Sequence, residues 1–200
     1  MKITGYLSYF YGIIIHPKST IKSLIEDPNR FRFGFFAVLL LGVLYTANYY
    51  IGYMNGHYPA SFEPFLRLPT ESYYLYNALF NLPISILSWL LFGCTIYLSI
   101  PQNDVRFEDT LAVLGLPYGI LILPLMWVPE IVMTIGWPNW YYESWWMQLT
   151  VIRVVLGTVW MYVGCTIAVK ELYKLSLPRS LFHTIIGVIV ALVISLIFLR

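Results

Sequence analysis

Histidine and acidic side chains are the first residues to test for chemistry in this sequence, because they can hold a metal ion or move a proton. The histidine and glutamate residues expected on the outer side of the membrane show no His-x-x-x-His or His-Glu-x-x-His spacing, which would place metal ligands on one helix face. His16 and His183 stand alone, and we interpret them as interfacial rather than catalytic. The sequence therefore predicts no catalytic residue, no metal, no cofactor and no enzyme. The outer histidine and glutamate residues are His57, Glu63, Glu71, Glu130 and Glu143.

The thiols are the next candidates. Cys94 and Cys165 both lie inside apolar runs and are far apart in the chain. No Cys-x-x-Cys pair is present, so neither a redox motif nor a zinc site is indicated. We interpret both cysteines as small apolar residues of the core.

A stretch rich in glycine and proline, Leu114–Pro124, is the least ordinary apolar run. Pro117 and Pro124 each remove a backbone donor, so the helix is expected to kink or unwind there. The break could act as a hinge or an ion-coordinating site. The interpretation we favour is a tolerated kink, with Gly115 and Gly119 forming a G-x-x-x-G face for close helix packing.

Polar residues inside the apolar runs are mostly amides. Asn48, Asn77 and Asn81 are expected to join helices through hydrogen bonds. The pattern places no charged residue at the centre of a run, which argues against a proton relay or a charge-coupled carrier. Arg153 is expected near the outer end of its run, with its stem reaching toward headgroups.

These residues must be positioned by membrane helices. With 59% hydrophobic and 11% charged residues, the chain lacks the polar surface of a soluble domain. A spanning helix needs about 20 apolar residues, and the runs are too continuous for a β-barrel. The fold class predicted is all-α, an integral membrane bundle of five transmembrane helices in one domain, residues 34–200. The predicted spans are Gly34–Tyr53, Leu75–Ile100, Thr110–Pro129, Leu149–Val169 and Leu181–Leu199.

Residues 1–33 form a segment of a different kind. Ile21, Leu24 and Ile25 recur at helical spacing while Lys18 and Lys22 point elsewhere. Pro17 suits the first turn of this helix, and the proline at position 28 would stop it. An amphipathic helix lying in the membrane interface is the favoured interpretation, with a solvated charged helix as the alternative.

Basic residues set the expected orientation. Most Lys and Arg residues precede the first run or fall in the second and fourth connections, which predicts a cytoplasmic N-terminus and an outer C-terminus in the cell membrane. The outer connection Trp137–Trp146 is rich in tryptophan and tyrosine, as an interfacial aromatic belt would be. A cage for a quaternary ammonium group around Glu143 is the alternative.

The order of parts resembles the Yip domain family of five-span membrane proteins, named for binding Ypt/Rab GTPases. Residues His16–Ile25 resemble the proline-led helix before the first span of prokaryotic members. Leu114–Tyr118 with Pro124 is similar to the family's third helix, and Lys170–Ser176 with Arg179 to its final hairpin. The Asp-Leu-Tyr-Gly-Pro element of eukaryotic members has no counterpart, so the resemblance implies a prokaryotic-type member.

The favoured hypothesis is a non-enzymatic membrane protein that acts by interaction at its cytoplasmic face. The candidate residues are Lys18, Lys22, Lys170 and Lys174. Candidate partners are membrane lipids, a protein at that face and a second copy of the chain; nucleic acid is not expected. The alternative hypothesis is a lipid or small-solute translocator with a path along the broken third helix.

Overall fold

Continuous apolar runs in this chain fold as long helices, because in a bilayer each backbone N–H and C=O must be paired within its own segment. The computed structural model describes residues 3–57, 70–101, 104–136 and 144–198, and no strand occurs in these ranges. Within them, 5 spans are long and apolar enough to cross a membrane, which confirms the predicted all-α membrane bundle. The elements are α1 (Ile3–Ile15), α2 (Pro17–Glu26), α3 (Arg30–Met54), η1 (Thr70–Ser72), α4 (Tyr73–Ser99), α5 (Phe107–Ile120), η2 (Leu123–Trp127), α6 (Val128–Gly136), α7 (Ser144–Tyr173) and α8 (Leu177–Phe198).

The third span is longer than predicted. We predict it to end at Pro129, but α6 continues that span to Gly136. Pro129 comes directly after the π-helical turn η2, in a helix that continues from Leu123, so the proline does not stop it. The fourth span begins at Gln148, within one residue of its predicted start. As a result, Glu130 lies within a helix rather than beyond the end of its span.

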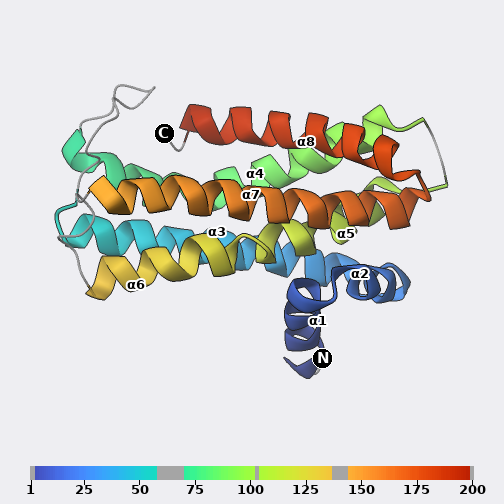
Figure 1. The fold of residues 1–200 in the computed structure, drawn as a ribbon, viewed down its shortest axis with the longest axis horizontal. Helices are drawn as coiled ribbons and strands as arrows, with labels where there is room; N and C mark the ends of the chain where they lie inside the picture. Colours follow the sequence, from blue (N-terminus) through green and yellow to red (C-terminus); the bar gives the residue numbers. More distant parts are fainter. Residues whose placement is uncertain (1–2, 58–69, 102–103, 137–143, 199–200) are drawn as a thin grey trace.

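The spans run side by side and form a ring of neighbours (Figure 1). α3 contacts α4 and α5, α8 contacts α4 and α7, and α5 closes the ring against α7. The third span consists of α5, the π-helical turn η2 and α6. At one end of the bundle, α2 lies beside α7 and α1 projects across the direction of the spans.

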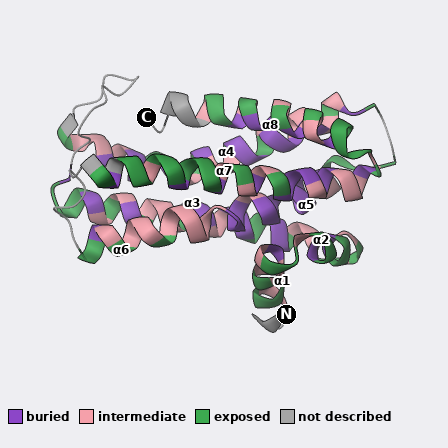
Figure 2. Cartoon of the chain, viewed as in Figure 1, coloured by how far each residue is buried: buried purple, intermediate pink, exposed green. Residues whose placement is uncertain are grey.

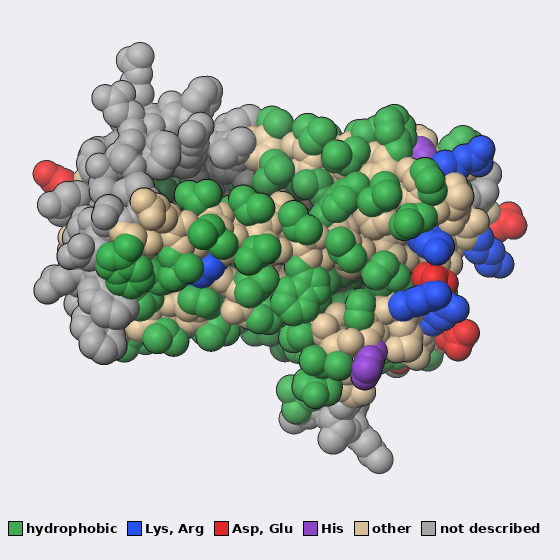
Figure 3. All heavy atoms as spheres, viewed as in Figure 1, with side chains coloured by type: hydrophobic (Ala, Val, Ile, Leu, Met, Phe, Trp, Pro, Cys, Tyr) green, Lys and Arg blue, Asp and Glu red, His purple; other side chains and the backbone are tan. Residues whose placement is uncertain are grey.

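The outside of the bundle is apolar, as expected where lipid rather than water is the surrounding medium. Residues coloured as exposed and as buried follow one another along each of the spans (Figure 2). Large hydrophobic residues such as Leu98, Val132 and Ile189 are exposed. On the face drawn in Figure 3, hydrophobic side chains cover the length of the bundle, while most of the charged ones gather at one end.

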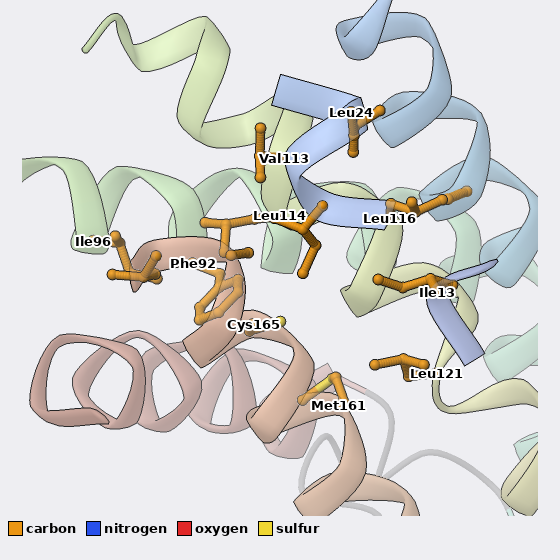
Figure 4. Close-up of a cluster of buried hydrophobic side chains, with 14 of the residues drawn as sticks. Ile13, Leu24, Phe92, Ile96, Val113, Leu114, Leu116, Leu121, Met161 and Cys165 are labelled. Carbon is orange, nitrogen blue, oxygen red and sulfur yellow. The ribbon is translucent and has the colours of Figure 1, made fainter. Parts of the chain in front are cut away.

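The core extends from the spans into the N-terminal helices. Ile13 of α1 and Leu24 of α2 are fully buried in the same cluster as Phe92, Leu114 and Cys165 (Figure 4). α2 buries one face on this cluster and exposes the other, as the helical spacing of its apolar residues predicts. Cys165 is a free thiol inside the cluster, consistent with a small apolar core residue.

Glycines bring α3 and α5 together at backbone distance. A Cβ atom at Gly115 would lie 2.6 Å from the carbonyl oxygen of Gly34, and one at Gly119 would lie 2.5 Å from backbone atoms of Ala37. A Cβ atom at Gly34 would overlap the carbonyl oxygen of Ala112. The G-x-x-x-G face is therefore occupied by α3, as the packing interpretation predicts.

Gly119→Ala is expected to destabilise the bundle by about 1–3 kcal/mol, the usual cost of overpacking. The higher helix propensity of alanine offsets only about 0.5–1 kcal/mol of this loss in stability. Backbone atoms of Ala37 cannot move aside as a flexible side chain could. Gly136→Ala is the matched control, because a Cβ atom there meets nothing within 4 Å. Thermal unfolding in detergent measures the difference, and equal midpoints for the two variants would contradict the close-approach interpretation.

Candidate functional site

One end of the bundle collects the charged side chains. In the described part of the chain, every Lys and Arg except Arg153 lies there, and Figure 3 shows these side chains gathered beside acidic ones. We call this region the basic end. It is formed by α2 and by the neighbouring ends of the spans. Its basic residues are Lys18, Lys22, Arg30, Arg32, Arg106, Lys170, Lys174 and Arg179.

The basic end brings together the two segments that carry the predicted interaction lysines. α2 lies against α7, and Lys22 Nζ is 3.7 Å from Glu171 Oε2. Such an exposed ion pair contributes little stability, so the apolar packing of α2 is what holds the two helices together. Lys18, Lys22 and Lys174 are exposed and Lys170 is half-buried. The four lysines therefore lie on adjacent helices, with charge available to a partner.

A stronger ion pair ties α3 to α5 at the same end. Arg30 donates from Nε and Nη2 to Asp109 Oδ1 at 2.9 and 2.6 Å. Both side chains are largely shielded from solvent, at 23% and 16% exposure. Arg106 adds a longer contact of 3.3 Å to the same carboxylate, but its own side chain is mostly exposed. The two charge-assisted hydrogen bonds from Arg30 to one carboxylate oxygen fix the start of α3 beside the start of α5.

The junction between α2 and α3 is also held by hydrogen bonds. Asp27 Oδ1 accepts from the backbone N–H of Asn29 at 2.7 Å, and Asp27 Oδ2 accepts from the hydroxyl of Tyr9 at 3.0 Å. Burial, and then the hydrogen bond to Asp27, raise the pKa of Tyr9 to about 12. The Tyr9 hydroxyl therefore stays protonated at ordinary pH and can donate to Asp27. This contact links α1 to the end of α2.

A tight turn sets the position of Lys174. This residue has φ of 53°, in the left-handed region that non-glycine residues rarely adopt. The backbone N–H of Leu175 donates to the carbonyl of Lys170 at 3.2 Å, which closes the end of α7. α8 starts soon after, at Leu177. The basic connection between the last two spans is thus a short, structured turn.

A second group of interest is the break in the third span. Pro117 lies inside α5, and Pro124 lies in the π-helical turn η2. A Cβ atom at Gly164 of α7 would overlap Leu121 and lie 3.1 Å from the side chain of Pro117. Leu121 is fully buried. The break is therefore packed tightly against α7 at this level.

Charged and polar side chains from three helices meet beyond the break, away from the basic end. Asn48 of α3 donates to Glu130 Oε1 of α6 at 3.0 Å. Arg153 of α7 donates from Nη1 to the carbonyl of Met126 in η2 at 3.2 Å. The opposite charges of Glu130 and Arg153 interact. We call Asn48, Glu130 and Arg153 the intramembrane cluster.

The position of Arg153 differs from the prediction. We expect its stem to reach toward headgroups, but the residue is only 8% exposed. Its Nη2 donates to Thr150 Oγ1 at 2.9 Å, and its guanidinium lies 4.3 Å from the ring centre of Trp146. The physical reason is that the guanidinium finds acceptors inside the protein, at the Met126 carbonyl of η2 and at Thr150, whereas the surrounding lipid offers none. The sequence signal that could have revealed the cluster is Arg153 within the fourth apolar run together with Glu130 directly after the third.

The three buried asparagines differ in whether they hydrogen-bond to another helix or to their own. Asn81 of α4 donates to the carbonyl of Gly42 in α3 at 2.9 Å, and Asn48 joins α3 to α6, so both link helices as predicted. Asn77 donates to the carbonyl of Tyr73 within its own helix. This is a departure from the predicted interhelical role. An amide can instead pair with the carbonyl one turn earlier, which costs no partner on another helix.

The predicted outer set of histidine and acidic residues is spread out. His57 is buried after α3 and its ring lies edge-on to Tyr74, while Glu71 is exposed. Burial lowers the pKa of His57. Glu63, Glu143 and the aromatic residues up to position 143 lie outside the described residues. Among the described residues, no three His, Cys, Asp or Glu side chains are grouped so as to hold a metal ion.

A serine and a histidine meet at the basic end without the geometry of a nucleophile and its base. Ser99 Oγ lies 2.9 Å from His183 Nδ1, joining α4 to α8. The Ser99 hydroxyl also donates to the carbonyl of Ile96 at 3.0 Å. A hydroxyl has one proton to donate, so in this arrangement the imidazole donates to Ser99 rather than taking its proton. The contact therefore joins two helices and does not activate the hydroxyl.

Comparison with known proteins adds one match. A family model, described as Yip1 domain, matches residues 11–199, which is nearly the whole chain. Neither the curated proteins nor the solved structures give a match. The matched range includes α2, all the spans and both segments that carry the interaction lysines.

Arg153→Met is expected to lower the stability of the bundle by about 1.5–3 kcal/mol, because the charged hydrogen bonds to Met126 and Thr150 are lost and the half-buried Glu130 loses an opposite charge. Adding Glu130→Gln should recover part of this loss, since both charges are then removed. Arg179→Met, at an exposed position on α8, is the control for losing an arginine. Unfolding in detergent gives the four corners of the cycle. A double variant less stable than Arg153→Met alone would show that the two charges do not compensate each other.

Proposed function

The chain belongs to the Yip1 domain family, and on that premise we propose that it is a non-enzymatic multi-pass membrane protein that engages a protein partner or anionic lipid at its basic end. The observation that carries the proposal is the meeting of α2 and α7. Their packing gathers Lys18, Lys22, Lys170 and Lys174 on adjacent helices. Along the spans, by contrast, the outward side chains are mainly apolar.

The proposal includes an orientation. Basic residues close to the ends of membrane helices are retained on the cytoplasmic side. We therefore assign the basic end to the cytoplasm of a cell, with the N-terminus cytoplasmic and α8 leading to the outer side of the cell membrane. The four lysines then face cytoplasmic proteins and the leaflet in which anionic lipids attract basic segments.

Two observations support an interaction role over catalysis. Ser99 and His183 are arranged as a structural contact, with the serine proton committed to a backbone carbonyl. The charged pair Arg30 and Asp109 holds α3 against α5. The lysines of α2 and α7 are not used in this way: the ion pair of Lys22 with Glu171 is long, and its lysine is mostly exposed.

Replacing Lys18, Lys22, Lys170 and Lys174 together by Gln is expected to weaken association at the basic end at least about tenfold, since each basic residue near an anionic surface contributes about 1 kcal/mol. The full chain would be extracted gently from its host membrane, and bound protein and lipid quantified by native mass spectrometry, with crosslinks mapped to α2 or α7. Arg179→Gln, at the same end but on α8, is the control. Unchanged association with both protein and lipid would refute the proposal.

The intramembrane cluster favours a second candidate, a lipid or small-solute translocator with a path along the broken third span. Charged residues inside membrane helices commonly mark such paths. Asn48 and Glu130 lie on the helices α3 and α6, and Arg153 contacts the break itself. Tight packing of Leu121 and Pro117 against Gly164 means that this path would have to open before anything could pass.

Flux into liposomes distinguishes the second candidate. If the path exists, Pro124→Ala should restore a donor at the break and change the flux of a fluorescent phospholipid or a small solute several-fold. Pro28→Ala, outside the spans, is the matched proline control. Liposomes holding the wild-type chain that show no flux above protein-free liposomes, or flux that Pro124→Ala leaves unchanged, would remove this candidate.

A further inference from the structure

α1 is an uncharged apolar helix that is too short to cross a membrane. It has 13 residues, Ile3–Ile15, and contains no acidic or basic side chain. At 1.5 Å per residue its length is about 20 Å, against roughly 30 Å for the hydrocarbon layer. Figure 1 shows α1 lying across the direction of the spans at the basic end. Its position therefore places it along a leaflet and not through the bilayer.

Aromatic contacts set the depth of α1. The ring of Tyr6 lies 4.5 Å from that of Phe33 and 5.0 Å from that of Phe36, both on α3. These residues follow Arg30, which pairs with Asp109 at the polar boundary, by one to two helical turns. The rise of a helix makes this about 5–9 Å. Helices that lie in a membrane interface are buried about 5–10 Å, so the depth of α1 agrees with that placement.

The outward face of α1 is a continuous apolar stripe. Leu7, Tyr11 and Ile15 are spaced by four residues, so they lie above one another on one face of the helix. Their exposed fractions are 62%, 69% and 48%. At the depth set by Phe33 and Phe36, the surroundings of this stripe are acyl chains. We call Leu7, Tyr11 and Ile15 the α1 stripe.

The stripe leads into a groove at the bend between α1 and α2, where an apolar lining meets two basic side chains. The groove has a volume of about 460 Å³ and is lined by Ile15, His16, Pro17, Lys18, Ser19 and Lys22. Ile15 belongs to both the stripe and the groove. Lys18 and Lys22 are one turn apart on α2, so both lie on the same side of this helix, and Lys22 Nζ is also 3.7 Å from Glu171. The apolar surface of the stripe thus gains cationic groups at a single bend.

We propose that the α1 stripe and the groove together bind one anionic phospholipid of the surrounding membrane. Its acyl chains lie along the stripe, and its phosphate lies between Lys18 and Lys22. A protein partner would fit less well, because the stripe lies at the depth of the hydrocarbon while only the groove faces the polar side. This inference rests on the proposed function, of which it names the ligand class and the residues.

The test uses the full chain in detergent micelles, with native mass spectrometry to count bound dioleoylphosphatidylglycerol and dioleoylphosphatidylcholine. The two lipids have identical acyl chains and differ in headgroup charge. Lys18→Gln with Lys22→Gln is expected to weaken phosphatidylglycerol binding by about thirtyfold, since two surface lysines are lost. Arg32→Gln with Arg179→Gln is the matched control, with equal charge loss at exposed positions of the same end but outside the groove, and should have little effect.

A second variant tests the stripe. Leu7→Ala with Tyr11→Ala removes contacts that do not depend on the headgroup, so both lipids should bind more weakly by a similar factor. Val151→Ala with Val155→Ala, on the exposed side of α7, is the control for losing apolar surface elsewhere. Equal losses in the stripe variant and this control would overturn the role of α1.

Three results would overturn the lipid site, and each has a different consequence for the proposed function. Equal losses from the lysine pair and from the control arginine pair would mean diffuse attraction to the basic end, with the proposed function intact. Displacement of phosphatidylglycerol by glycerol 1-phosphate would mean that the groove takes a free phosphate. Loss of a crosslinked protein partner in the fourfold Gln variant, with lipid binding unchanged, would mean that the basic end recognises protein instead.

Discussion

The backbone contact between α3 and α5 is the constraint on which the rest of this bundle depends. Lipid gives helices no hydrophobic reason to associate, so close van der Waals packing has to replace it. Gly34, Gly115 and Gly119 allow that packing, because any Cβ atom at these positions would meet backbone. The same contact aligns the starts of the two helices, where Arg30 and Asp109 pair, and it presents the broken part of the third span to α7. The fold is therefore arranged around the third span.

The intramembrane cluster follows from the break in that span. Carbonyl groups freed at a break must find a donor within the protein, because lipid has none. Arg153 supplies one at Met126, but an arginine in this environment needs a compensating charge. Glu130 can carry the opposite charge, interacts electrostatically with Arg153 and accepts a hydrogen bond from Asn48 on α3. These polar contacts lie next to the proline-containing break in the third span, and they join α7 to η2 and α6 to α3.

Much of the fold could be predicted from the sequence, because a continuous apolar run of about 20 residues has few alternatives to a membrane helix. The helix ends could not be predicted as well, since Pro129 lies inside a helix that continues from η2 and does not act as a stop. α1 was not predicted, because its 13 mostly apolar residues are too few to span a membrane and show no clear helical alternation of polar and apolar positions. The electrostatic interaction of Glu130 with Arg153 depends on how distant helices face each other, and spacing along the chain does not indicate that. The four lysines could be proposed from their charge, whereas their meeting required the packing of α2 on α7.

The buried residues of α2 explain why the basic end can act as a binding surface. Ile21 and Leu24 are fully buried in the core that the spans share, so the backbone carrying Lys18 and Lys22 is already fixed before any ligand arrives. The opposite lysine group is fixed as well, because Lys174 lies in a closed turn between α7 and α8. A surface that is ordered in advance loses little conformational entropy on binding, and more of the electrostatic attraction is kept as affinity. In α2, packing and binding are therefore coupled: its buried apolar face fixes the helix, and the fixed helix presents the lysines of its exposed face to a ligand.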